Sequence, residues 1–325
     1  MKILVVRFSS IGDVVLTTPV VRALKEQLPD IEIHFLTKQQ FGSIVTPNPN
    51  IDTVHTIQKS IDEVLPQLKA EEFDWIIDLH NNVRTKGLKM KLRRPTKTFR
   101  KLNLEKWLLV NAKVNRMPEI HVVDRYFEAV AHLGASADGK PCDFFIEPEN
   151  EVHLSDWKLN AQQYVAIAIG AQHATKCLPT EKMLELIDAI DDPIVLVGGP
   201  TDLEKSEAIV AKTGKEITNT VGHLNLQQSA SLVKQAKHLI THDTGMMHIA
   251  SSFEIPMSTV WGNTVPDFGM YPYQPTNKRY TVHQVEGLKC RPCSKIGSES
   301  CPKKHFDCMM KQDISNIKER MNQSS

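Results

Sequence analysis

The segment with the clearest chemical potential is the turn Asp243-Thr-Gly-Met-Met-His248. A strand-like apolar run leads into this turn, and a helix-like pattern follows at once. Gly245 lets the backbone approach a ligand closely, and the free N–H groups of the first helical turn face an anion. The turn is therefore typical of a phosphate site, and it marks the active site if the anion is a nucleotide diphosphate. A helical histidine such as His248 is more often structural, although a neighbouring anion site changes that balance.

Two other loops in the second half of the chain have residues that suit a nucleotide. Lys176 ends the glycine-bearing loop 170–176, where its ammonium group could contact phosphate as a mobile point charge or simply be solvated. Asp202 ends the turn Gly198-Gly-Pro-Thr-Asp202. An acid at such a turn either bonds a ribose hydroxyl or favours the dipole of the following helix. The pattern does not separate Asp202 from Glu204.

Asp13 closes the turn Ser9-Ser10-Ile11-Gly12-Asp13, which follows the first apolar run and opens a helix-like pattern. One interpretation is structural, with Asp13 capping the helix. The other is catalytic, with a carboxylate that takes a proton from an attacking hydroxyl group. The spacing leaves both open, and they are compatible only if backbone N–H groups do not use the whole carboxylate. The turn is not a dinucleotide fingerprint, because G-x-G-x-x-G is absent.

Basic residues crowd the segment Arg84–Lys106, in which Glu105 is the only acid. Runs of charge are usually solvated surfaces. This one lies in a nearly neutral protein and has Leu88, Met90 and Leu92 interleaved. We therefore favour contact with a phosphorylated acceptor or with an anionic bilayer surface. Nucleic acid is disfavoured, because aromatic interleaving is sparse.

Four cysteines cluster near the C-terminus, as Cys290-x2-Cys293 followed by Cys301 and Cys308, with His305 between the last two. These residue types suit a structural zinc ion, although the two halves are closer together than in common zinc fingers. The alternative is a surface loop with reduced or partly disulfide-linked thiols. A cytosolic protein would disfavour a simple disulfide framework.

Strand-like and helix-like patterns alternate along the chain and must position these residues. The expected strands are Ile3–Arg7, Ile31–Leu36, 54–57, Trp75–Leu79, Tyr164–Ile169, Ile194–Val197, His238–Thr241 and Met257–Trp261. Helices are expected over Val14–Leu28 and Asp124–Leu133, and an edge strand with a linker over 141–150. This alternation predicts an α/β protein with two doubly wound parallel-sheet domains and a cleft between them. Ligands of such sheets bind beyond the C-terminal strand ends, where all the loops named above fall.

The composition supports a folded protein without a strong global field. Lysine and arginine total 39 against 38 acids, so nothing global favours nucleic acid as a partner. No apolar run approaches the roughly 18–20 residues of a membrane span. The opening run Met1–Val6 is too short for the core of a signal peptide, and Arg7 ends it. The cytoplasm is the expected compartment.

Taken together and in this order, the motifs resemble glycosyltransferase family 9, the lipopolysaccharide heptosyltransferases. The resemblance extends over nearly the whole chain and rests on Arg7-Phe-Ser-Ser-Ile-Gly-Asp-Val-Val-Leu-Thr-Thr-Pro19, the loop with Lys176, the turn 243–248 and the Cys-x2-Cys…Cys-Pro…His…Cys-Met tail. It implies a GT-B fold of two Rossmann-like domains, with an acceptor domain over 1–152, a nucleotide-sugar domain over 153–310 and a helix over 311–325 that crosses back to the first.

The resemblance also implies a reaction: inverting, metal-independent transfer of a heptose from ADP-heptose to a lipid A-linked acceptor. Asp13 is then the candidate base. The donor residues would be Lys176, Thr244 and Gly245 at the diphosphate, Asp243 and His248 shaping that site, and Asp202 or a neighbouring acid at the ribose. The acceptor residues would be Ser10, Gly12, Asn81, Asn82 and Arg84. Contact with the inner membrane through Arg84–Lys106 fits such an acceptor.

Other functions remain open at this point. A different nucleotide sugar or acceptor within the same family would use the same motifs. A non-catalytic nucleotide-binding protein could keep the fold, although it would have no need of Asp13 and Lys176. A Rossmann-type reductase is disfavoured by the missing glycine fingerprint.

Overall fold

The protein, described here by a computed structural model of residues 1–324, divides into two compact units. The first unit contains residues 1–102 and 119–145, and the second contains residues 103–118 and those from 146 onward. The chain therefore changes unit at 102/103, 118/119 and 145/146. The sequence-based domains, with their division at 152/153, stay a prediction.

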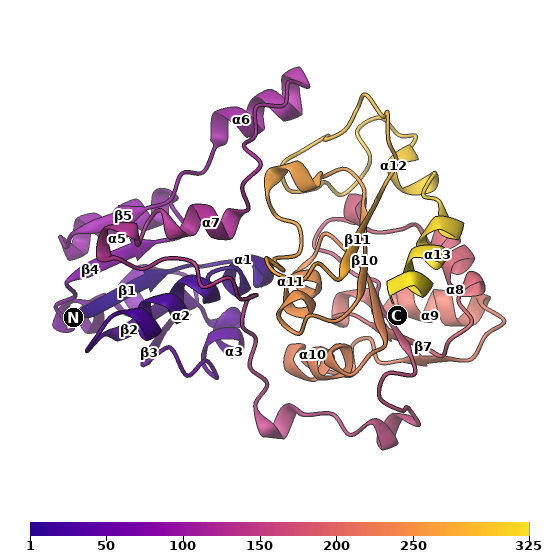
Figure 1. Ribbon diagram of the computed structural model, residues 1–325, viewed down its shortest axis with the longest axis horizontal. Coiled ribbons are helices and arrows are strands. Elements are labelled where there is room, and N and C mark those ends of the chain that lie inside the picture. The colour runs from indigo at the N-terminus through magenta and orange to yellow at the C-terminus, as the bar shows by residue number, and fades with distance from the viewer. Residues whose placement is uncertain (325) are drawn as a thin grey trace. The chain divides into compact units, whose positions relative to one another are not determined.

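The first unit is built on a parallel sheet with the spatial order β3-β2-β1-β4-β5 (Figure 1). Its strands are β1 (Lys2–Val6), β2 (Glu32–Lys38), β3 (Thr53–Ile57), β4 (Trp75–Asp78) and β5 (Thr96–Thr98). In the centre, Val5 lies opposite Phe35 of β2 and Ile77 of β4. Such runs of buried β-branched and aromatic residues are typical of a parallel sheet that is covered on both faces.

Six helices belong to this unit: α1 (Ile11–Val15), α2 (Thr18–Gln27), α3 (Gly42–Val45), α4 (Leu65–Ala70), α5 (Val83–Leu92) and α7 (Val122–Phe127). Leu68 of α4 and Leu88 of α5 join Leu4 and Val6 of β1 in one buried cluster. Ile3 alternates with these strand residues and is fully buried as well. Both faces of β1 are therefore covered, as the sequence pattern predicted.

The second unit contains a larger parallel sheet with the order β11-β10-β9-β6-β7-β8, of which Figure 1 labels β7, β10 and β11. Its strands are β6 (Val165–Ala168), β7 (Ile194–Val197), β8 (Ile217–Asn219), β9 (His238–His242), β10 (Met257–Trp261) and β11 (Tyr280–Gln284). The helices are α6 (Asn103–Trp107), α8 (Thr180–Ala189), α9 (Leu203–Lys212), α10 (Leu226–Lys234), α11 (Gly245–Ser252), α12 (Asp307–Met310) and α13 (Ile314–Ser324).

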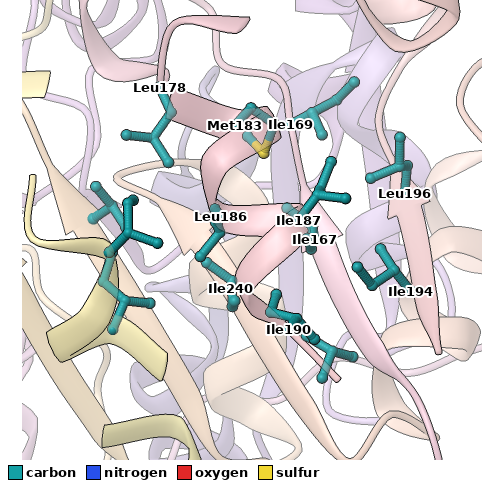
Figure 2. Close-up of a cluster of buried hydrophobic side chains, with 14 of the residues drawn as sticks. Ile167, Ile169, Leu178, Met183, Leu186, Ile187, Ile190, Ile194, Leu196 and Ile240 are labelled. Atoms are coloured by element: carbon teal, nitrogen blue, oxygen red, sulfur yellow. The ribbon is translucent and has the colours of Figure 1, made fainter. Parts of the chain in front are cut away.

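Helices cover both faces of the second sheet. Figure 2 shows Met183 and Leu186 of α8 packed with Ile167 of β6 and Ile240 of β9. The other face holds Ala166 and the side chains of α10 and α11. The last helix, α13, packs on α8, β10 and β11. Its expected return to the first unit stays a prediction.

Both sheets have the same topology, and this topology locates the candidate sites. Numbered within its own unit, the first sheet runs 3-2-1-4-5 and the second runs 3-2-1-4-5-6, and both follow the order of a doubly wound nucleotide-binding fold. The strand order reverses between β1 and β4 in the first sheet and between β6 and β9 in the second. Ligands bind beyond the carboxyl ends of the strands at such switch points.

Some expected elements differ from the structure. The helix predicted over Val14–Leu28 is divided into α1 and α2. The hydroxyls of Thr17 and Thr18 donate to the carbonyls three residues earlier, at 2.7 and 2.8 Å, and Pro19 lacks the N–H that a continuous helix needs. The helix predicted over Asp124–Leu133 is likewise too long, because α7 ends at Phe127 and separate turns lead to Gly134.

The edge strand expected over 141–150 is also wrong. That stretch, which the structure describes in full, forms no strand. The backbone N–H of Glu147 donates instead to Gln227 on α10 at 2.9 Å. The side chain of Gln227 thus accepts a backbone hydrogen bond that a neighbouring strand would otherwise accept.

Residues 103–118 form an arm on the second unit that the sequence pattern did not reveal. Leu109 packs with Val265 and Phe268, and the Nζ atom of Lys113 donates to the carbonyl of Pro292 at 2.6 Å. The amide of Asn115 donates to Asp267 at 2.6 Å. The arm thus braces the loops that follow β10 and β11.

Candidate active site

Asp13 lies in α1, just beyond the end of β1, and both of its carboxylate oxygens are engaged. Its Oδ2 atom accepts from the backbone N–H of Ser10 at 3.1 Å and from the Ser10 hydroxyl at 2.8 Å. Its Oδ1 atom lies 2.5 Å from the guanidinium of Arg7. The side chain is 21% exposed, so it remains open to a ligand. The carboxylate therefore caps the turn without being used up by backbone N–H groups.

Arg7 is a further site residue, which the sequence pattern marks only as the end of the first strand. Its Nε donates to the carbonyl of Ser9 at 2.8 Å, and its Nη1 donates to that of Leu79 at 2.5 Å and to the hydroxyl of Tyr126 at 3.0 Å. Burial opposes the charge of Arg7, but the neighbouring Asp13 carboxylate raises the pKa of the guanidinium above its ordinary value. Burial also raises the pKa of Tyr126 to about 12. Arg7 is thus a fixed cation that joins the ends of β1 and β4.

The loop after β4 is shaped by the fully buried carboxylate of Asp78. Its Oδ1 accepts from the N–H groups of His80 and Asn81, at 3.0 and 2.6 Å, and its Oδ2 pairs with Lys89 at 2.9 Å. Burial, followed by the charge of Arg7, lowers the pKa of His80 to about 4. The Nδ1 atom of His80 has no hydrogen-bond partner among residues 1–324. His80 is therefore a neutral imidazole near Asp13 with one nitrogen that has no partner in the described residues, and nothing in the local sequence pattern marks it.

The other acceptor candidates differ in how far their side chains are already used. Asn82 caps α5, since its Oδ1 accepts from the N–H of Thr85 at 2.9 Å. Asn81 donates to the carbonyl of Phe99 at 3.3 Å. Arg84 is exposed, and its guanidinium lies 5.5 Å from the centre of the Phe8 ring. Of these side chains, Arg84 is the one most available to an anionic substrate.

The predicted phosphate turn has the expected local structure. β9 ends at His242, Asp243 and Thr244 form the turn, and α11 begins at Gly245. Thr244 occupies the N-cap position but makes no capping bond with its side chain. The first-turn N–H groups of α11 are thereby left for another acceptor, as an anion site requires. His248 is only 3% exposed, which suits a part in shaping the turn.

Lys176 lies beside this turn, because β6 and β9 are neighbours in the sheet. Its ammonium group is 2.7 Å from the carboxylate of Asp243 and donates to the Asp243 carbonyl at 3.2 Å. The hydroxyl of Thr264, which follows β10, donates to the same carboxylate oxygen at 2.8 Å. Asp243 therefore orients Lys176, and Thr264 orients Asp243. Nothing in the local sequence pattern marks Thr264, whose partner is far away along the chain.

Asp202 lies against the ends of β6 and β7. Its Oδ2 accepts from the N–H of Gly199 at 2.9 Å. A Cβ atom at Gly170 would be only 2.0 Å from this oxygen, so glycine is required there to make room for the carboxylate. Glu204 is exposed in the first turn of α9. The geometry therefore favours Asp202 over Glu204 as the acid of this loop.

The cysteine loop is held by hydrogen bonds to the loops that carry the donor candidates. The N–H of Cys293 donates to the carbonyl of Asn263 at 2.9 Å, and Ser298 exchanges bonds of 2.8 to 3.1 Å with Thr175. Arg291 donates to the carbonyl of Thr264 at 2.8 Å. The loop thus braces both Lys176 and Asp243 through their neighbours.

The structure does not support the zinc site predicted at Cys290, Cys293, Cys301 and Cys308. All four thiols are free, and within residues 1–324 no three of these sulfurs converge as metal ligands would. The group that does converge is Glu32, His34 and Glu71. There the ammonium of Lys2 already lies 2.6 Å from Glu71 and 3.5 Å from Glu32.

Solved structures with the same architecture show the fold. The ADP-heptose lipopolysaccharide heptosyltransferase II of E. coli matches with a TM-score of 0.73 at 18% identity, covering 100% of this chain and 98% of that one. E. coli heptosyltransferase WaaC with ADP matches with a TM-score of 0.68 at 20% identity, covering 100% of both chains. The two parallel sheets are those of a GT-B protein, as the sequence predicted.

Sequence comparison then gives the family. The profile of glycosyltransferase family 9 (heptosyltransferase) matches residues 62–304. Lipopolysaccharide heptosyltransferase 3 of Escherichia coli K12 is 25% identical over 284 residues, which cover 78% of this chain and 80% of that protein. The chain belongs to glycosyltransferase family 9, and it is an enzyme of the EC 2.4 transferase type.

Proposed function

We propose that this enzyme transfers a heptose from ADP-heptose to a lipid A-linked acceptor of the lipopolysaccharide core. The observation that carries the proposal is the pair of switch points described above. One presents the carboxylate of Asp13, and the other presents an uncapped helix N-terminus beside Lys176. The two similar E. coli proteins are named lipopolysaccharide heptosyltransferase 3 and ADP-heptose lipopolysaccharide heptosyltransferase II, and these names favour this donor and acceptor within the family.

Asp13 is the proposed base. As the acceptor oxygen attacks the anomeric carbon, its proton passes to the carboxylate, the new glycosidic bond forms and the bond to the diphosphate oxygen breaks. Attack from the face opposite the leaving group inverts the configuration at that carbon. A well-placed base contributes roughly 10²–10⁴-fold to such a step. Arg7 keeps the carboxylate oriented from behind.

The second unit is proposed to stabilise the departing ADP. Negative charge develops on the diphosphate as the bond breaks, and fixed donors near that charge lower the barrier. Thr244, Gly245 and the first-turn N–H groups of α11 would receive it, and Lys176 would add a positive charge. Asp243 and His248 would shape this site. These groups replace a metal ion in the proposed mechanism.

The remaining substrate contacts are assigned by position. Asp202, rather than Glu204, would bond the ribose of the donor, because its carboxylate lies at the strand ends. Ser10, Gly12, Asn81, Asn82 and Arg84 would line the acceptor side. We assign acceptor recognition mainly to Arg84 among them, since a lipid A-core acceptor is anionic and this guanidinium is exposed.

The proposed acceptor places the enzyme on the cytoplasmic face of the inner membrane, in peripheral contact through residues 84–106. No helix within residues 1–324 combines the length and the apolarity needed to cross a bilayer. Of the apolar residues interleaved in this segment, Leu88 and Leu92 are buried and Met90 is 72% exposed. Leu88 and Leu92 therefore belong to the core, and Met90 is the apolar side chain of the three that is free to contact a membrane. The basic residues and Met90 carry this part of the proposal.

Release of ADP is the test. Purified enzyme would be offered a panel of nucleotide sugars, each with and without a lipid A-core acceptor. The proposal predicts acceptor-dependent release from ADP-heptose. Release of UDP from UDP-sugars, with no release of ADP from ADP-heptose, would overturn the proposed donor. Release of ADP only with unrelated acceptors would overturn the proposed acceptor. Nucleotide binding without release of any nucleoside diphosphate would indicate a non-catalytic protein.

A further inference from the structure

A basic hollow lies between α4 and α5, apart from the candidate active site. Its volume is about 640 Å³. Four cations surround it, namely Lys69, Lys91, Arg93 and Arg94. Its remaining walls are apolar, from Leu68, Met90 and Leu92. The hollow thus combines positively charged groups with apolar walls.

Two of these cations have no partner, and the other two are weakly held. The side chains of Lys69 and Arg93 make no hydrogen bond or ion pair with any of residues 1–324. Lys91 pairs with Asp62, and Arg94 lies 3.3 Å from Glu72. Both acids are well exposed, and exposed ion pairs contribute little. A ligand with several anionic oxygens can therefore recruit all four cations.

The hollow lies at the opposite edge of the sheet from Asp13. α4 leads into the N-terminal end of β4, and α5 leads into the N-terminal end of β5. Asp13 follows the C-terminal end of β1, which runs parallel to both strands. The hollow is therefore separate from the acceptor residues at the strand tips.

The outer face of α5 continues the chemistry of the hollow. Val83 is 84% exposed and Met90 is 72% exposed, and their spacing of seven residues places them on the same helical face. Lys86 is exposed between them. No acid occurs anywhere in α5. A soluble phosphate would gain nothing from the exposed apolar side chains, whereas the interface of an anionic bilayer suits both kinds of residue.

We propose that this hollow binds the phosphate headgroup of an anionic membrane lipid while Val83 and Met90 contact the bilayer interface. The proposal rests on the proposed function, because a lipid-linked acceptor requires the enzyme to work at a membrane. It narrows the membrane contact from residues 84–106 to a defined headgroup site on α4 and α5. Lys69, which lies outside that basic segment, becomes part of the contact.

Vesicle binding tests the site with a matched control. The double variant Lys69→Gln, Arg93→Gln removes the two unpaired cations. Lys212→Gln, Lys278→Gln removes the same charge from two exposed positions of the second unit. Each variant would be sedimented with phosphatidylglycerol vesicles and with phosphatidylcholine vesicles. Each basic residue at an anionic surface contributes about fivefold, so the hollow variant loses about 25-fold in affinity for phosphatidylglycerol and the control loses less than about twofold.

Three results would overturn the headgroup site. Equal losses in the two variants would show only a general effect of net charge. Unchanged binding by the hollow variant would place the contact elsewhere. Thermal stabilisation by millimolar inorganic phosphate that depends on Lys69 and Arg93, without vesicle binding, would assign the hollow to a soluble anion.

The proposed function is separated from this site by a second measurement. ADP release with a delipidated, water-soluble acceptor does not require a membrane, so the hollow variant keeps its turnover there. If vesicle binding depends on the hollow while the wild-type enzyme releases no ADP, the proposed function fails and the lipid site stands. If ADP is released normally while vesicle binding does not depend on the hollow, the lipid site fails and the proposed function stands.

Discussion

Each unit has a carboxylate paired with a cation at its switch point, and the two pairs differ in which partner is fixed. In the first unit Arg7 is bound on every side, to Ser9, Leu79, Tyr126 and Asp13. In the second unit Lys176 contacts Asp243, through the carboxylate at 2.7 Å and the carbonyl at 3.2 Å. The guanidinium is a rigid planar fork, whereas the lysine ammonium is a point charge on a flexible stem.

Under the proposed function, this difference lets one sheet topology supply the two halves of a reaction. In the proposed mechanism, a fully bound arginine holds its carboxylate partner in place as the proton acceptor. A lysine that is held by a single residue can turn toward a phosphate, as a leaving group needs. Because the two units share a sheet order, their different proposed roles depend on a few side chains at the strand ends.

The largest effect is expected from Asp13→Asn. The amide keeps the size of the carboxylate and can still accept from Ser10, but it is a very poor base. We expect kcat to fall by roughly 10²–10⁴-fold, measured as acceptor-dependent ADP release. Glu63→Gln is the matched control, because Glu63 also caps a turn by accepting from a serine N–H, at 2.7 Å, and is distant in sequence from the site residues. Near wild-type turnover in Asp13→Asn would remove this residue from the mechanism.

Lys176→Gln tests the second pair. A charge-assisted hydrogen bond contributes about 1.5–3 kcal/mol, so the dissociation constant for ADP should rise by about 10- to 150-fold in calorimetry. Lys212→Gln, at an exposed position of the same unit, serves as the control and should bind ADP normally. Unaltered ADP affinity in the Lys176 variant would show that this lysine serves only to hold Asp243.

Low pH should lower the free energy of unfolding of the second unit, because His242 of that unit is buried. Burial lowers the pKa of His242 to about 3, and its Nε2 accepts from the N–H of Leu178 at 3.0 Å. The unfolded chain takes up this proton near pH 6.5, whereas the folded protein resists it down to about pH 3. Stability is therefore full above about pH 6.5 and declines as the pH falls. At pH 5 the loss from this residue is about 2 kcal/mol.

The control for that prediction is His242→Gln, which can still accept from Leu178 but does not titrate. Denaturant unfolding between pH 7 and pH 5 should show a smaller decline in the variant than in the wild type. Equal declines would show that His242 does not carry the effect.

The smallest effect is expected from Thr264→Val. This change removes one donor to Asp243 and keeps the shape of the side chain. The KM for the donor should rise about 2- to 10-fold with little change in kcat, because the change acts on the donor only through Asp243, and the net contribution of one hydrogen bond is about 0.5–1.5 kcal/mol. Thr264→Ser, which retains the hydroxyl, should restore the wild-type KM. A loss confined to kcat would contradict a positioning role.

The local pattern predicted the two sheets without their edge strands β5, β8 and β11, and it predicted most of the candidate loops, because apolar runs that end in polar or glycine residues mark the tips of buried strands. It failed where distant contacts decide the structure. Thr264 and the arm 103–118 depend on partners far away in the sequence. Arg7 was visible as a charge at the end of an apolar run, but its four partners were not. The break between α1 and α2 depends on hydroxyl bonds that compete with the helix.

The most direct test of these two proposed roles, the base in the first unit and the leaving-group site in the second, measures ADP affinity and sugar transfer in parallel for Asp13→Asn and Lys176→Gln. We predict that the Asp13 variant binds ADP as tightly as the wild type and transfers little sugar, whereas the Lys176 variant is weakened already in binding ADP. Equal weakening of ADP affinity in both variants, or normal transfer by the Asp13 variant, would contradict the assignment of the base to the first unit and the leaving group to the second.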